Sequence, residues 1–103
     1  MSKFLARQGD VLIVAVEELP KERKAVQRKN GRVILAEGEL SGHFHAIADP
    51  DVELFETASA VDRFLRVGQR GAALVHDEHS TIQLPPGNYL VRRQVEFIGR
   101  VVD

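Results

Sequence analysis

The chain of 103 residues contains no cysteine and no tryptophan. Without cysteine there can be no disulfide, thiolate zinc site, iron–sulfur cluster or cysteine nucleophile, and this composition is typical of the cytoplasm. No stretch approaches the roughly 20 apolar residues of a membrane-spanning helix, and residues 1–7 lack the apolar run of a signal peptide. The net charge of −1 provides no general attraction for nucleic acid or an anionic membrane. We therefore expect a cytoplasmic protein without a membrane partner.

Several catalytic signatures are also missing. The sequence has no glycine-rich phosphate loop and no Gly-x-Ser-x-Gly element around a nucleophilic serine. It has no His-Glu-x-x-His element either, so a zincin-type protease is excluded by pattern. Any active site must therefore come from a less familiar arrangement of residues.

The length and the hydrophobic pattern predict one all-β domain over residues 1–103. Hydrophobic residues make up 44% and charged residues 28%, as in ordinary globular proteins. Short β-branched or alternating segments are separated by turn residues, and no segment shows a convincing 3.6-residue period. We predict a small barrel or sandwich of about eight or nine short antiparallel strands. The expected strands are residues 10–19, 33–35, 43–47, 52–56, 63–67, 72–76, 81–84 and 89–98, with 101–102 as a further short one.

All four histidines fall in two short clusters, His43 with His45 and His76 with His79. Imidazole titrates near neutrality and is the commonest protein ligand of transition metals. Side chains alternate along a strand, so His43 and His45 should project from one face, about 7 Å apart. His76 and His79 would face opposite sides of a straight strand, but a bend between them would bring both rings to one rim. The clustering predicts a shared site.

The leading hypothesis is a divalent transition-metal site for Zn²⁺, Fe²⁺, Mn²⁺ or Ni²⁺. His43 and His45 would be ligands, and His76 or His79 would complete the set. Three ligands with an open position would be catalytic, whereas four would be structural. Glu78 would act as a ligand or general base and His79 as a second catalytic candidate, although the sequence leaves open whether the protein is an enzyme. Further residues that could line the cavity are Glu39, Gln94 and Glu96.

Two alternatives remain open. One is a metal-independent enzyme that cleaves a phosphodiester or RNA, with one histidine accepting a proton and another donating one. Residues 21–32 carry six basic residues against one acid and could guide a small phosphate-containing ligand, but they lack the aromatics of nucleic-acid sites. The other alternative is a non-catalytic partner-binding module, which predicts that the two clusters lie far apart. Exposed sheet edges would favour a homodimer.

The sequence also carries two resemblances to known groups of proteins. His43, His45, Pro85 and Gly87 resemble the motifs of a miniature cupin, which implies a jelly-roll barrel with metal-binding histidines; Leu90 stands where cupins have their third histidine. The chain is also similar to a group of small, poorly characterised bacterial all-β proteins with Gly-His-x-His and His-x-Glu-His elements. That second resemblance implies no activity. The elements that carry it are residues 9–11, 38–45, 76–79 and 84–96.

Overall fold

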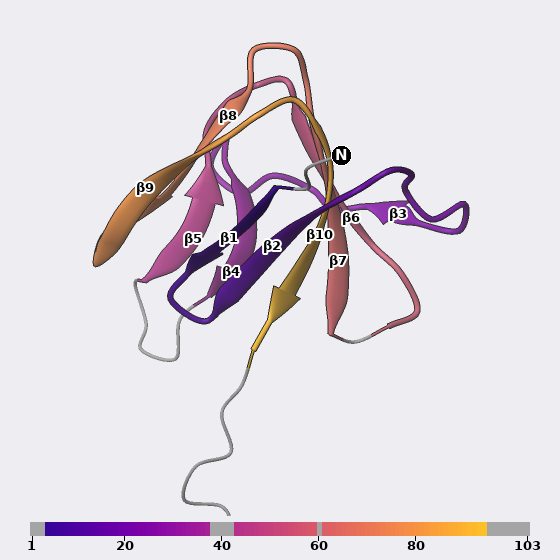
Figure 1. Cartoon of the computed structure of the whole chain (residues 1–103), viewed down its shortest axis with the longest axis horizontal. Helices are drawn as coiled ribbons and strands as arrows, with labels where there is room; N and C mark the ends of the chain where they lie inside the picture. The colour runs from indigo at the N-terminus through magenta and orange to yellow at the C-terminus, as the bar shows by residue number, and fades with distance from the viewer. Residues whose placement is uncertain (1–3, 38–42, 60, 95–103) are drawn as a thin grey trace, which may run out of the picture.

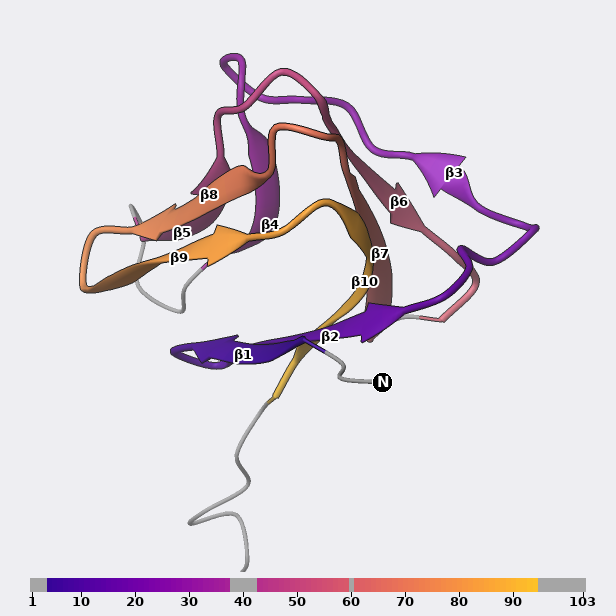
Figure 2. The same cartoon turned by 45° about the horizontal axis from the view of Figure 1, so that its top comes forward.

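The computed structural model describes residues 4–37, 43–59 and 61–94, and the regular structure in these ranges is entirely β (Figure 1). Ten strands lie in two antiparallel sheets, which face each other as in a sandwich and do not close into a barrel (Figure 2). The described residues include no helix that could cross a bilayer. The predicted all-β class is therefore confirmed in its sandwich form.

The larger sheet has six strands and includes both ends of the described chain. The first hairpin, β1 and β2, pairs with β10, and β10 continues through β7 and β6 to the two-residue strand β3. In spatial order the strands are β1 (Leu5–Gln8), β2 (Val11–Val16), β10 (Gly87–Arg93), β7 (Asp62–Val67), β6 (Val52–Glu56) and β3 (Lys24–Ala25).

The smaller sheet has four strands, and it carries the histidines. Two register shifts mark β-bulges: β4 has one extra residue against β5, at Leu35, and β9 has one extra residue against β8, where Ser80 and Thr81 face Val75. In spatial order the strands are β4 (Val33–Glu37), β5 (Phe44–Ile47), β8 (Ala72–His76) and β9 (His79–Leu84).

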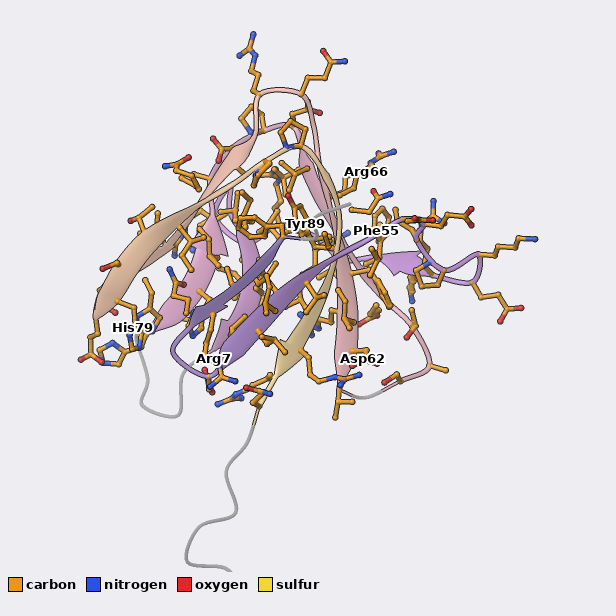
Figure 3. The ribbon with its side chains drawn as sticks, viewed as in Figure 1. Arg7, Phe55, Asp62, Arg66, His79 and Tyr89 are labelled. Carbon is orange, nitrogen blue, oxygen red and sulfur yellow. The ribbon has the colours of Figure 1, made fainter. Side chains whose placement is uncertain are left out.

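The core lies between the facing sheets. Strand β8 shows why: Ala72 and Leu74 are buried and alternate with Ala73 and Val75, because successive strand side chains point to opposite faces. Near the middle of the molecule, the Tyr89 ring is buried and its hydroxyl donates to the Pro85 carbonyl (Figure 3). The larger buried apolar residues are Val11, Ile13, Val33, Leu35, Ile47, Val52, Leu54, Phe55, Leu65, Val67, Leu74, Leu84, Tyr89 and Val91.

Two hairpin turns use backbone conformations that glycine favours. Asn30 and Gly31 have φ of 53° and 77°, the type I′ turn that their sequence predicts, and the Lys29–Arg32 bridge closes it. Gly9 has φ of 58° at the first position of the turn between β1 and β2, as in a type II′ turn. The second turn brings the Gly9–Asp10 pair to the histidine end of the molecule.

The basic stretch, residues 21–32, reads in the sequence as a polar hairpin or a mobile loop. Only its tip is a hairpin, because Lys24–Ala25 pairs with β6 as strand β3 instead. Arg28 donates to the carbonyl oxygens of Asp49 at 2.6 Å and Val52 at 3.0 Å. At least one of these cations therefore has a structural role.

Candidate metal centre

The four histidines meet at one end of the smaller sheet, and Figure 3 shows His79 at the outer tip of β9. Ala46 of β5 pairs with Val75 of β8, so the same register places His45 opposite His76. His76 in turn pairs with His79 across the hairpin of β8 and β9. His45, His76 and His79 thus form a row across three strands.

Ring distances confirm that the two sequence clusters adjoin. The ring centroids of His45 and His76 are 4.4 Å apart, and those of His76 and His79 are 4.7 Å apart. His43, just before β5, stacks on His76 at 6.0 Å. The partner-binding hypothesis predicts clusters far apart in space, and that expectation is wrong.

The two-residue turn between His76 and His79 explains why both rings lie on one face of the sheet. A two-residue turn, Asp77 and Glu78, separates them, so they are directly opposite in an antiparallel pair. Opposite residues project from the same face of a sheet. The anticipated bend is therefore a tight hairpin turn, and it brings both rings to one side.

The outer part of the cluster joins a histidine to a carboxylate. His43 Nδ1 lies 3.0 Å from each Asp77 carboxylate oxygen, and its Nε2 lies 3.9 Å from Glu78 Oε2. The hydrogen bond to Asp77 raises the pKa of His43, and the same bond lowers the pKa of Asp77. One donor atom each from His43, His76 and Asp77 lies within 4.8 Å of the other two. These three residues form the outer triad, a set that could hold a metal ion.

His76 joins the outer triad to the interior. It is 7% exposed, and its Nδ1 accepts the Glu78 backbone N–H at 3.0 Å. The same nitrogen lies 3.4 Å from Asp77 Oδ1. Because Nδ1 accepts a hydrogen bond, it carries no proton in this arrangement, and the proton of a neutral His76 ring is on Nε2.

The inner part of the cluster is built on His45, which is only 2% exposed. Its Nδ1 lies 2.8 Å from Gln8 Oε1, and its Nε2 lies 3.3 Å from Asp10 Oδ1. Burial, and then the neighbouring His76, lower the pKa of His45 and favour the neutral ring. Burial alone would raise the pKa of Asp10, but Arg93, whose Nε donates to Asp10 Oδ2 at 2.8 Å, lowers it overall.

The turn between β1 and β2 lies against His45 and His79. A Cβ at Gly9 would lie 2.7 Å from His79 Nε2 and 3.4 Å from His45 Cε1. Since real Cβ atoms almost never come within 3.0 Å of such a neighbour, only glycine fits without a shift. The backbone of Gly9 therefore lies directly against two imidazole rings.

The remaining sequence candidates differ in their placement. Glu78 is exposed, with its carboxylate toward His43. Gln94 lies beside the β1–β2 turn, where its N–H donates to the Asp10 carbonyl and its side chain accepts from Arg7, so these hydrogen bonds join it to the turn rather than to a histidine. Glu39 and Glu96 lie outside the described residues.

Three further residues join His45 to form what we call the inner site, and sequence reasoning misses all three: Gln8, Asp10 and Arg93. The apolar pattern places Asp10 at the start of a strand, and it gives Gln8 no role. A glycine followed by an aspartate between two apolar segments is a hairpin signal, and it could have placed Asp10 in a turn. No local signal links that turn to histidines some 35 residues away in the chain.

Comparison with known proteins gives a family and no activity. A family model described as a domain of unknown function, DUF8820, matches residues 7–94 and so spans every residue of the inner and outer sites. Searches of curated proteins and of solved structures found no match. Neither the cupin resemblance nor the resemblance to the small bacterial group is confirmed by these findings.

Proposed function

Since the chain belongs to the DUF8820 family, whose description assigns no activity, its function must be inferred from the site, and we propose that it binds a divalent transition metal. The outer triad of His43, His76 and Asp77 would supply the first ligands. The observation that carries this proposal is the convergence of their donor atoms within 4.8 Å. Two neutral imidazoles and a carboxylate suit Zn²⁺, Fe²⁺, Mn²⁺ or Ni²⁺.

The spacing of the outer triad fits a metal ion after a small contraction. Bonds of about 2.1 Å in a tetrahedron place neighbouring donors about 3.4 Å apart. The donor atoms, which lie within 4.8 Å of one another, are therefore at most about 1.4 Å too far apart. His43 and Asp77 can close this difference by small side-chain rotations, because their side chains are 25% and 57% exposed and are not packed in the core.

Proton exchange would accompany binding. The Nδ1 of His43 shares a proton with Asp77 in the present arrangement, and a metal ion bound between them would displace it. Three protein ligands would leave a position open to water or a small-molecule ligand, which is the arrangement of catalytic sites. Glu78, with its carboxylate beside His43, would be the general base in such a site, and His79 the neighbouring second candidate.

The metal-free alternative has weaker support. Cleavage of a phosphodiester needs a cation to hold the phosphate near the histidines. Among the described residues, the arginine joined to the cluster is Arg93, and its guanidinium is already engaged by Asp10. The metal proposal needs no such additional group.

Elemental analysis tests the proposal. Protein purified without an affinity tag should retain at least about one equivalent of a transition metal at neutral pH, or regain it after incubation with Zn²⁺ or Mn²⁺ and dialysis. The double variant His43→Ala, Asp77→Asn should lose that equivalent. Less than about 0.2 equivalents in the wild-type protein under both conditions would contradict the proposal.

A further inference from the structure

We propose that the inner site is a second cation position, formed by His45 Nε2 and Asp10 Oδ1, with Gln8 as the residue that orients His45. The inference rests on the proposed function, because it assigns a second ion to the same histidine cluster. It adds a donor from the larger sheet to a site that otherwise belongs to the smaller one.

The orientation of the Gln8 amide is fixed by chemistry. Gln8 is 2% exposed, and its Nε2 lies 3.0 Å from the Leu74 carbonyl oxygen and 2.9 Å from that of Ser80. An oxygen in that position would face two other oxygens with no proton to share. The amide nitrogen must therefore point toward the two carbonyl groups, and Oε1 must point toward His45.

The fixed amide determines which nitrogen of His45 carries a proton. Gln8 Oε1 can only accept a hydrogen bond, so the His45 Nδ1 that lies 2.8 Å away must donate. The neutral ring then has its lone pair on Nε2, the atom that faces Asp10 Oδ1 at 3.3 Å. A lone pair and a carboxylate oxygen at this distance require a proton or a cation between them.

Asp10 is held in place for this role. Arg93 Nε occupies Oδ2 at 2.8 Å, which leaves Oδ1 directed at His45. The backbone carbonyl of Asp10 accepts the Gln94 N–H at 2.7 Å, so the turn itself is also anchored. Such support around a ligand is what orients metal-binding carboxylates in known sites.

The spacing matches a metal ion better than that of the outer triad does. The 3.3 Å between His45 Nε2 and Asp10 Oδ1 is close to the roughly 3.4 Å edge of a tetrahedral site. His79 is placed to supply a third donor, because its Nε2 lies against Gly9, the residue before Asp10. The rings of His45 and His76 are 4.4 Å apart, so the inner position adjoins the outer triad and the pair could act as a two-metal site.

Metal stoichiometry is the test, with untagged full-length protein titrated with Zn²⁺ and dialysed at neutral pH. The wild-type chain should bind about two equivalents, and both Asp10→Asn and His43→Ala should bind about one. The matched control is Asp62→Asn, since Asp62 is also paired with an arginine, but its carboxylate accepts from Arg92 and does not face the histidine cluster; it should keep both equivalents. Gln8→Met should weaken one equivalent by about 10- to 100-fold without changing the other.

The outcomes separate the two proposals. One equivalent in the wild-type protein, unchanged in Asp10→Asn and lost in His43→Ala, would overturn the second position and leave the proposed function standing. No bound metal in the wild-type protein would overturn both. If Asp10→Asn does not fold, ¹⁵N NMR of the wild-type imidazoles decides the matter. The second equivalent must then shift His45 Nε2 while Nδ1 stays protonated, and an unshifted Nε2 would contradict the assignment.

Discussion

Two adjoining regions lie on the inner face of the smaller sheet, and they differ in chemistry but not in burial. Ile47 and Leu74 are 0% exposed, and two residues along the same strands His45 and His76 are 2% and 7% exposed. The apolar pair needs only neighbours that exclude water. The histidines need a partner for each buried nitrogen, and no buried side-chain nitrogen or oxygen in the described part of the chain lacks one. Comparable burial therefore stabilises the fold in one region and holds the partnered polar groups of the proposed binding site in the other.

The largest loss of stability should come from a substitution in the apolar region. Leu74→Ala removes a side chain that is fully buried and leaves a cavity, so we expect a loss of about 2–5 kcal/mol in the free energy of unfolding. Urea denaturation followed by circular dichroism measures it. The protein that remains folded should still bind metal, because Gln8 donates to the Leu74 backbone carbonyl, which alanine keeps. Intact stability in this variant would show that the apolar region is not the core.

Two glycine substitutions test how closely the β1–β2 turn packs on the histidines. Gly9 and Gly31 both have positive φ, so alanine should cost each about 1–3 kcal/mol of stability. Only at Gly9 does the added Cβ also meet a histidine, because nothing lies within 4 Å of it at Gly31. Gly9→Ala should therefore weaken metal binding as well, whereas Gly31→Ala should not. Equal metal affinity in the two variants would contradict the close packing of His79 on the turn.

The smallest expected effect is a change in how the stability of the metal-free protein depends on pH. The lowered pKa of His45 means that the unfolded chain takes up this proton more readily than the folded one, so stability should fall as the pH drops below about 6.5. His43 has a raised pKa, so its contribution is full at low pH and is lost as the pH rises through the folded value. Thermal unfolding at several pH values should show a shallower acid loss in His45→Gln and a steeper one in His43→Gln. The same slope in both would mean that the two rings do not differ in environment.

Strands with clear apolar alternation are predictable from the sequence, whereas β1, which lacks it, is not. The predicted bounds of β6 and β8 agree with the structure, because clear alternation or an apolar run is closed there by turn residues. Strand β1 escapes prediction because residues 5–8 place a glutamine, and not an apolar residue, at the buried position. The predicted strand at 10–19 is shorter, Val11–Val16, since Gly9 and Asp10 form a turn. In the predicted strand 89–98, residues 95–98 lie outside the described ranges.

The candidate site is predictable only in part, for a related reason. His43, His45, His76 and His79 stand out because their spacing alone suggests convergence. Their partners in the larger sheet depend on how two hairpins pack against each other, and that contact has no local signature in the sequence. Gln8 makes three of the hydrogen bonds between the first hairpin and the smaller sheet. Nothing in the sequence around Gln8 distinguishes it from other polar residues.

Gln8 also links the histidine cluster to local unfolding. It belongs to β1, the first strand of the chain and an edge strand with a single neighbour in its sheet, and segments near chain ends open at low free energy. When β1 opens, the bonds that Gln8 donates to β8 and β9 and the one it accepts from His45 of β5 break together, and His45 loses the contact that fixes its proton. If His45 binds a cation as proposed, opening of the edge and loss of the ring that would bind it are one event. Amide hydrogen exchange in residues 5–8 would therefore report occupancy of the inner site without any probe placed on it.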